Sequence, residues 1–327
     1  MASVDKSKLK NVQKDFEAIK KEIAKSVVGQ GKVVEGILRG LIANGHILIE
    51  GLPGIAKTLV VRTVAEVTGC KFSRIQFTVD LLPSDIVGIT TYDKSRGFTI
   101  LKGPVFANFV MADEINRATP KTQSALLEAM QEKQVTIGRT TYPLDKPFFV
   151  MATQNPIEQS GVYELPEAQV DRFLFKLKMD YPTLAEEELI LEQNMTLKHF
   201  NDFKLKPIWN PKKILELQNL AKDIHIDNHI SKYIVDIIDA TRNPDKYKVH
   251  AGKYLQYGSS PRASIGLFIS AKTQALLKGS DYVKPQHVKD VAYDVLRHRL
   301  LLNYEGQAEN IDKDTIVKEI LERVPTP

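Results

Sequence analysis

Apolar positions along the chain follow two different spacings, which predict two regions. In the first region, helical stretches alternate with short apolar runs of strand length at residues 46–50, 71–77, 107–113, 147–153 and 173–179. Strands that alternate with helices predict a mainly parallel, five-stranded sheet covered on both faces. Beyond this region, the apolar spacing is almost wholly helical, at 211–223, 229–241, 261–278, 285–299 and 312–323. We therefore expect an α/β core over residues 1–206 and an all-α domain over residues 207–327.

Two interruptions of the α/β pattern predict β-hairpins. Residues 88–103 and residues 134–144 each contain β-rich runs separated by turn residues. The charges in and beside these hairpins are of both signs: Asp93, Lys94, Arg96, Arg139, Asp145 and Lys146. A mixed set of charges does not form the basic stripe that is typical of nucleic-acid binding.

Composition narrows the possible classes of protein without choosing among them. The chain has 327 residues, a formal net charge of +5 and a single cysteine, Cys70, so neither a disulfide framework nor a cysteine zinc site is expected. The first 25 residues alternate charged and apolar positions, unlike a signal peptide. No apolar run approaches the roughly 20 residues of a membrane span. The expected location is the cytoplasm, without membrane insertion.

The stretch "EGLPGIAKT" (50–58) is the first candidate for chemistry, because it joins a predicted strand to a predicted helix. It resembles the phosphate-binding pattern G-x-x-x-x-G-K-[ST], in which successive backbone N–H groups point at phosphate oxygens. Gly51 and Gly54 would let the chain wrap around the phosphates. Lys57 would reach the β- and γ-phosphates, and the Thr58 hydroxyl would bind Mg²⁺.

Ala56 departs from that pattern, because it occupies the position of the last glycine. A β-carbon is tolerated where φ is negative and costs roughly 1–2 kcal/mol in a left-handed conformation. A working loop with alanine here predicts a negative φ at Ala56, within the first turn of the helix. The left-handed conformation should then fall on Gly54 alone, and Ala56→Gly should slightly lower stability.

Two further strand ends carry polar residues. "NFVMADE" ends in Asp113 and Glu114, about 55 residues after the loop. An acid at the end of a strand beside the phosphate loop can hold Mg²⁺ through water, and a second acid can polarise the attacking water. "FFVMATQNP" places Asn155 just after another strand, where its amide could orient that water.

Two arginines complete the candidate set. Arg172 lies in "VDRF", just before the fifth strand, and Arg262 lies in "GSSPRAS". There, Ser259 or Ser260 could cap a helix that has a proline in its first turn. An arginine near a transferred phosphate offsets developing negative charge and can come from a neighbouring subunit. From the residues alone, each could instead be a surface or ion-paired arginine.

These segments together resemble one family. The ordered set "GLPGIAKT", "VMADEINRA", "ATQNPIEQSGVYELPEAQVDRF" and "SSPRA" resembles the MoxR family of AAA+ ATPases, from "VVGQ" (27–30) to the end of the helical region. The hairpins also resemble those of the helix-2-insert clade, which includes magnesium chelatase and MCM helicase subunits. The resemblance implies a P-loop AAA+ core with a helical lid.

The resemblance also implies roles for individual residues. Nucleotide would be bound by Val28, Gly29, Gly51, Pro53, Gly54, Ile55, Ala56, Lys57, Thr58 and Leu59. Asp113 and Glu114 would form Walker B, and Asn155 would be sensor 1. Arg172 would be the arginine finger, and Arg262 would be sensor 2. In MoxR proteins alanine is the usual residue before the lysine, so its presence does not indicate an inactive site.

The function implied by the resemblance is an ATPase that uses ATP and Mg²⁺ to remodel client proteins. Family members form hexameric rings and act with proteins that carry a von Willebrand factor A domain, in assembling or metal-loading clients. Two alternatives stay open at this point. One is a DNA-acting motor of MCM-like type, and the other is a nucleotide-dependent scaffold with negligible turnover. DNA-stimulated turnover would favour the former, and tight binding without turnover the latter.

Overall fold

A computed structural model describes residues 5–95, 97–156, 161–192 and 199–327, so Arg96 of the first hairpin lies outside the described residues. The chain forms two compact units. The α/β unit comprises Glu17–Phe173 and Leu177–Leu215, and the helical unit comprises Met1–Phe16, Leu174–Lys176 and Glu216–Pro327. Contacts thus divide the chain within helix α8, at residues 215–216. The domain boundary expected near residue 206 stays a prediction.

The α/β unit is built on the five-stranded sheet that the apolar runs predict, in the order β2-β5-β8-β1-β9. Its strands are β1 (Ile47–Gly51), β2 (Phe72–Gln76), β5 (Phe109–Asp113), β8 (Phe149–Gln154) and β9 (Phe175–Met179). The pairs β2–β5, β5–β8 and β1–β8 are parallel. The strand that carries the two acids is therefore not beside the strand that leads into the phosphate loop, because β8 lies between them. Helical crossovers let parallel strands pair out of chain order in this way.

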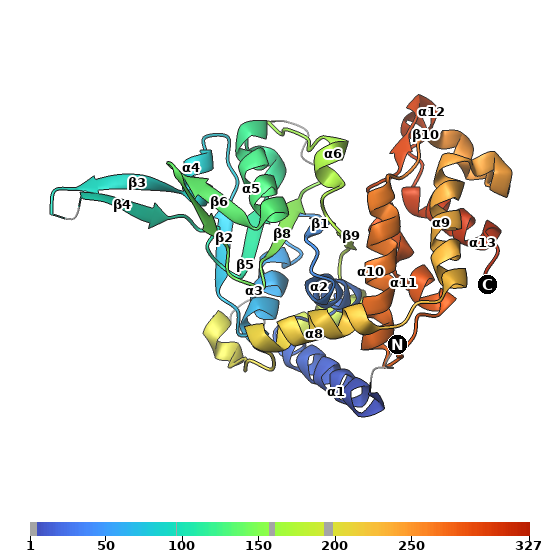
Figure 1. Cartoon of the computed structure of the whole chain (residues 1–327), viewed down its shortest axis with the longest axis horizontal. Coiled ribbons are helices and arrows are strands. Elements are labelled where there is room, and N and C mark those ends of the chain that lie inside the picture. The colour runs from blue at the N-terminus through green and yellow to red at the C-terminus, as the bar shows by residue number, and fades with distance from the viewer. Residues whose placement is uncertain (1–4, 96, 157–160, 193–198) are drawn as a thin grey trace. The chain divides into compact units, whose positions relative to one another are not determined.

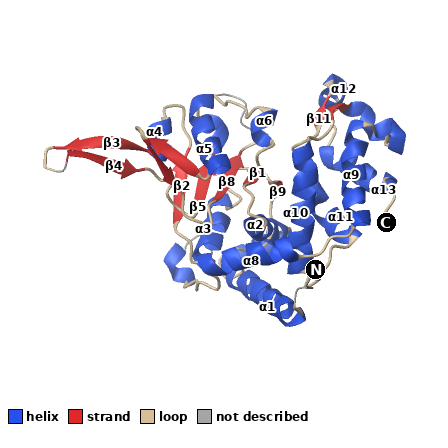
Figure 2. Cartoon of the chain, viewed as in Figure 1, coloured by secondary structure: helices blue, strands red, loops and turns tan. Residues whose placement is uncertain are grey.

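Helices cover both faces of this sheet (Figure 2). Alternate residues such as Leu48, Val110 and Val150 pack with Leu126 and Met130 of α5 in one buried cluster. Helix α3 contacts β2 and β5, and it carries a buried apolar stripe of its own. The helices of the first 215 residues are α1 (Lys6–Ile23), α2 (Gly31–Ile42), α3 (Lys57–Val67), α4 (Pro83–Val87), α5 (Pro120–Glu132), α6 (Glu167–Val170), α7 (Leu184–Glu192) and the start of α8 (Pro211–Asp223).

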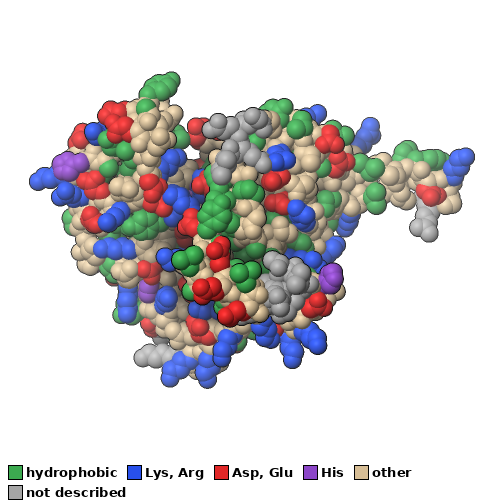
Figure 3. All heavy atoms as spheres, turned by 180° about the vertical axis from the view of Figure 1, so that it is seen from behind, with side chains coloured by type: hydrophobic (Ala, Val, Ile, Leu, Met, Phe, Trp, Pro, Cys, Tyr) green, Lys and Arg blue, Asp and Glu red, His purple; other side chains and the backbone are tan. Residues whose placement is uncertain are grey.

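Both predicted hairpins are present as antiparallel two-stranded sheets. They are β3 (Gly88–Asp93) with β4 (Gly97–Lys102), and β6 (Gln134–Ile137) with β7 (Thr140–Pro143). The β3–β4 hairpin extends away from the sheet (Figure 1). Apolar side chains are exposed along it (Figure 3), among them Tyr92, Phe98 and Leu101. A two-stranded hairpin that is exposed in this way gains little from burial of its own side chains.

The helical unit confirms the helical spacing of the C-terminal region. Its elements are α9 (Asn228–Arg242), β10 (Leu255–Tyr257), α10 (Pro261–Leu277), α11 (Pro285–Leu296), β11 (Leu301–Leu302), α12 (Tyr304–Ala308) and α13 (Lys313–Arg323). Ser260 caps α10 as expected, because its hydroxyl accepts a hydrogen bond from the N–H of Arg262, with Pro261 in the first turn. Within the described part of the chain, we find no helix with the length and apolar character needed to cross a bilayer.

Candidate active site

The phosphate-loop candidate runs from the end of β1 to the first residue of α3. Helix α3 begins at Lys57, so Thr58 lies in its first turn, where backbone N–H groups have no partner within the helix. The Lys57 ammonium group donates a hydrogen bond to the Gly51 carbonyl oxygen at 2.6 Å, so the lysine folds back over the loop. The amino end of a helix and a lysine together make a site for a polyanion.

The conformation of Ala56 contradicts the expectation drawn from the sequence. Ala56 has φ 64° and ψ 27°, which is left-handed, and it is the N-cap of α3 rather than a residue of its first turn. Gly54 is also left-handed, with φ 81°, whereas Ile55 between them is not. Alternation between right- and left-handed residues directs successive N–H groups to one side of the chain and creates an anion-binding concavity. The geometry of this concavity therefore requires a left-handed residue at position 56, even though alanine carries a β-carbon.

This finding reverses the expected effect of Ala56→Gly on stability. Relief of left-handed strain gains roughly 1–2 kcal/mol, and the added freedom of glycine in the unfolded chain offsets about 0.4–1 kcal/mol of it. We expect Ala56→Gly to raise the free energy of unfolding by up to about 1.5 kcal/mol in urea titrations. Gly54→Ala is the matched control and should lower it, although an added β-carbon would meet no atom within 4 Å. A destabilised Ala56→Gly protein would contradict this account.

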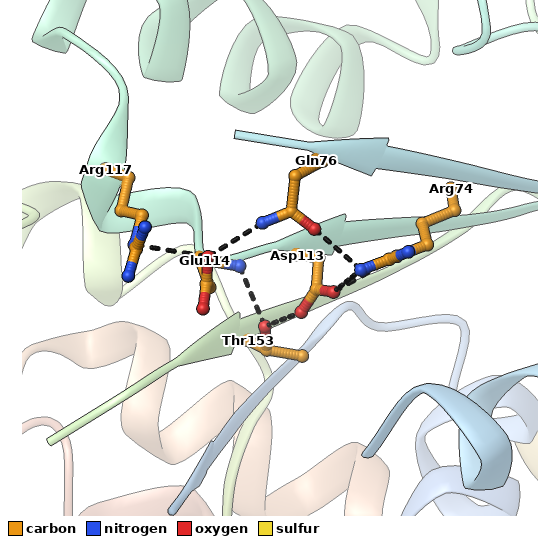
Figure 4. Close-up of polar contacts among 6 residues, drawn as sticks. All are labelled: Arg74, Gln76, Asp113, Glu114, Arg117 and Thr153. Atoms are coloured by element: carbon orange, nitrogen blue, oxygen red, sulfur yellow. Dashed lines mark hydrogen bonds and ion pairs between the residues drawn. The ribbon is translucent and has the colours of Figure 1, made fainter. Parts of the chain in front are cut away.

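Asp113 lies at the carboxyl end of β5 and is held by two neighbouring strands (Figure 4). The residue is only 7% exposed. Its Oδ1 accepts a hydrogen bond from the Thr153 hydroxyl of β8 at 2.6 Å. Its Oδ2 accepts from Nε and Nη2 of Arg74 on β2, at 3.1 Å and 2.6 Å. A buried carboxylate needs such partners, and they fix its orientation at the edge of the sheet.

Glu114 follows immediately and is held by a different set of contacts (Figure 4). Its Oε2 accepts a hydrogen bond from Nε2 of Gln76 at 2.7 Å and lies 3.1 Å from Nε of Arg117. Its backbone is left-handed, with φ 55°, and its N–H donates to the Thr153 hydroxyl at 2.9 Å. A left-handed glutamate is strained by roughly 1–2 kcal/mol, and such strain is characteristic of functional sites.

Arg74 and Gln76 join the two acids into one network, and the sequence analysis did not identify them. Nη2 of Arg74 also donates to Oε1 of Gln76 at 2.6 Å, so β2 contacts both Asp113 and Glu114. The available signal was the alternation in "FSRIQ", where two long polar residues flank the buried Ile75. That pattern indicates which face of the strand is polar, but not that β2 pairs with the strand that bears the acids.

The candidate groups converge on one edge of the sheet. Because β1, β5 and β8 are parallel, Gly51, Asp113 and Gln154 end at the same side, and Asn155 follows directly after β8. Ligands of open α/β sheets bind outside the carboxyl ends of the strands. Asn155 is buried, with 6% of its surface exposed. The loop, the acid pair and the amide thus face the same region.

A cavity of about 600 Å³ adjoins the loop and has a mostly apolar lining. Six of the predicted nucleotide-binding residues line it: Val28, Pro53, Gly54, Ile55, Ala56 and Leu59. The other wall comes from α7 and from the residues just before it, with Tyr181, Pro182, Glu187, Ile190 and Leu191. Its size and apolar lining suit a planar base beside a phosphate site. No sequence pattern indicates the α7 wall, because the apolar residues of that helix do not follow a single stripe.

The segment 27–30 is fixed against the beginning of α7. Nε2 of Gln30 donates to the Asp180 carbonyl oxygen at 2.7 Å. Gly29 has φ 69°, a conformation that favours glycine, and a β-carbon there would come within 2.8 Å of Cδ of Glu186. Hydrogen bonds from the Thr183 N–H and hydroxyl keep the pKa of Glu186 below its ordinary value, so this carboxylate stays charged beside the cavity. Gly29 does not line the cavity itself, but both of its neighbours in the sequence do.

The two predicted arginines are exposed. Arg172 follows α6, and its N–H closes a turn onto the Gln169 carbonyl oxygen at 3.2 Å. Arg262 belongs to the helical unit, at the beginning of α10. Their roles as arginine finger and sensor 2 stay predictions.

Comparison with known proteins decides the family. A sequence model described as "ATPase family associated with various cellular activities (AAA)" matches residues 46–175, and a model of the AAA lid domain matches residues 249–320. Chaperone MoxR1 of Mycobacterium tuberculosis is 47% identical over 309 residues, which cover 94% of this chain and 81% of that protein. The chain belongs to the MoxR family of AAA ATPases.

Other MoxR relatives extend along nearly the same length. Protein MoxR of Methylorubrum extorquens is 28% identical, and the match covers 94% of both chains. A crystal structure of a Cytophaga hutchinsonii protein assigned as an ATPase is 46% identical, with a TM-score of 0.91, covering 98% of this chain and 97% of that one. The MoxR fold is therefore an α/β AAA core with a C-terminal helical lid region, as the sequence resemblance implies.

Proposed function

We propose that this MoxR protein binds ATP with Mg²⁺ and hydrolyses it in order to remodel client proteins. The observation that carries the proposal is the convergence at one sheet edge of the Lys57 loop, a base-sized cavity and the Asp113–Glu114 pair. Nucleotide binding requires only the Lys57 loop and the cavity. The hydrogen-bonded acid pair, with Asp113 buried and Glu114 partly exposed, supports hydrolysis over simple nucleotide binding.

Each residue then has a separable role. Lys57 and the N–H groups of the loop hold the phosphates, and the apolar cavity holds the base. The Thr58 hydroxyl and the Asp113 carboxylate would hold Mg²⁺, since hard oxygen donors are its preferred ligands. The metal would neutralise negative charge on the phosphate oxygens. Glu114 accepts the proton of the attacking water, and Asn155 orients that water.

The remodelling activity is inferred from relatives and from the hairpins. The Mycobacterium tuberculosis relative carries the name chaperone, and we extend that function to this chain. We also propose a hexameric ring in the cytoplasm and a partner with a von Willebrand factor A domain. The exposed apolar side chains of the β3–β4 hairpin, including Phe98 at 80% exposure, offer a contact surface for a partner or client.

The test is phosphate release by the purified chain, with and without the partner that co-purifies from the source cells. We expect hydrolysis that disappears when EDTA removes Mg²⁺. Replacing residues 89–101 by a tight turn should leave basal hydrolysis unchanged and abolish stimulation by the partner. No Mg²⁺-dependent hydrolysis by the folded protein would refute the ATPase, and stimulation that survives the deletion would refute the role of the hairpin.

A further inference from the structure

Strand β9 is an edge strand of the sheet. Within the described part of the chain, one side of its backbone therefore pairs with no other strand of that sheet. Such an edge presents carbonyl groups at alternate residues that need other partners. Two side chains of the helical unit supply them. Nη1 of Arg297 donates to the Lys176 carbonyl oxygen at 2.6 Å, and Nη1 of Arg299 donates to the Leu174 carbonyl oxygen at 3.2 Å. These contacts help to place Leu174–Lys176 with the helical unit rather than with the α/β unit.

Both guanidinium groups are buried and held in place. Arg297 is 9% exposed, and its Nε and Nη2 bind the two oxygens of Asp314 at 2.9 Å and 3.2 Å. Its Nη1 also lies 2.9 Å from Asp294. Arg299 is 7% exposed and also donates to the Val295 carbonyl oxygen. A planar guanidinium fixed in this way is a rigid donor, which a flexible ammonium group cannot reproduce.

Helix α10 contacts the same segment at a glycine. A β-carbon at Gly266 would lie 3.5 Å from Cδ1 of Leu174, 3.9 Å from Nη1 of Arg299 and 3.1 Å from Cγ1 of Val295. Gly266 comes about one turn after Arg262 in α10. The segment 174–176 is therefore fixed by two buried arginines and packed against the helix that begins beside Arg262.

We propose that Arg297 and Arg299, which we name the β9 clamp, are positioning residues for Arg172. The inference rests on the proposed ATPase, in which Arg172 acts on the nucleotide of a neighbouring subunit. Arg172 precedes Leu174 by two residues, and two residues span at most about 7 Å. A displacement of the clamped segment is therefore passed directly to Arg172. The clamp thus holds the segment that directly follows Arg172, the residue that completes the next subunit's site.

The test uses the full-length chain with Arg299→Met, and Arg299→Lys as the conservative variant. Arg323→Met is the matched control, because this arginine of the helical unit is exposed and its contact with Glu319 is long, at 3.8 Å. Since a misplacement of about 1 Å can cost on the order of 100-fold, we expect kcat of Arg299→Met to fall by about 10- to 100-fold. The affinity for ATP should not change. The kcat of Arg299→Lys should fall by less than that of Arg299→Met.

Mixing with Lys57→Ala subunits separates positioning of Arg172 from general damage. A Lys57→Ala subunit is inactive at its own site but lends a correctly placed Arg172 to its neighbour. Activity should therefore recover in mixtures with Arg299→Met, as it should with Arg172→Ala. Wild-type kcat in folded Arg299→Met, or a loss that mixing does not restore, would overturn the proposal. If Arg299→Met fails to fold, Arg299→Lys is judged by the same two criteria. A wild-type chain without turnover would instead refute the proposed ATPase.

Discussion

The Glu114→Gln protein is expected to bind ATP like the wild-type chain and to hydrolyse it about 100- to 10,000-fold more slowly. The amide has nearly the same shape as the carboxylate and can still accept a hydrogen bond from Gln76, which donates at 2.7 Å. It cannot accept the proton of the attacking water. Because Glu114 belongs neither to the phosphate loop nor to the cavity lining, nucleotide affinity should not depend on its charge.

The measurement is steady-state phosphate release together with equilibrium binding of a fluorescent ATP analogue. Glu132→Gln, at the exposed end of α5, is the matched control and should behave like wild type. Lys57→Ala should instead lose binding itself, because it removes the ammonium group that lies over the loop. Wild-type turnover by Glu114→Gln would show that another group activates the water, and that the Glu114 network is structural.

The second large effect is expected from Arg172→Ala. Loss of an arginine that stabilises transferred phosphate costs on the order of 1,000-fold or more in rate in related systems. The side chain is exposed, so its removal should not unfold the α/β unit. Nucleotide binding should persist, because Arg172 is not part of the cavity beside the phosphate loop.

Subunit mixing tests whether Arg172 acts on a neighbour. Arg172→Ala and Lys57→Ala chains should each be nearly inactive alone, while a mixture should recover activity at interfaces that pair an intact loop with an intact arginine. Arg323→Ala is the control for loss of an exposed arginine and should keep full activity. A fully active monomer at high dilution, or a mixture as inactive as its components, would contradict action in trans.

The sequence determined those features that depend on local pattern. Apolar runs at 46–50, 107–113 and 147–153 correspond to β1, β5 and β8 of the sheet, because buried parallel strands are apolar on both faces. Turn residues between β-rich runs located both hairpins. The cap at Ser260 could also be predicted from the sequence, since it involves only residues that are close in the chain. Motif spacing identified the family that the comparisons then showed.

Only the tertiary structure decided how separate segments meet. The strand order places β8 between β5 and β1, and so brings Thr153 to Asp113. Pairing of β2 with β5 brings Arg74 and Gln76 to the acids, and α7 closes the cavity. Contacts of this kind join residues that are distant in sequence, and no local pattern records which strands will be neighbours.

Ala56 shows most clearly where local sequence preference fails to predict the backbone conformation. Local preference favours a negative φ for alanine, and the structure gives φ 64°. Positions 54–56 must turn their N–H groups to one side between β1 and α3, and this requirement outweighs a preference of roughly 1–2 kcal/mol at one residue. The sequence determined that a phosphate loop lies here. The fixed positions of the strand and the helix on either side determined the backbone conformation through which the loop forms.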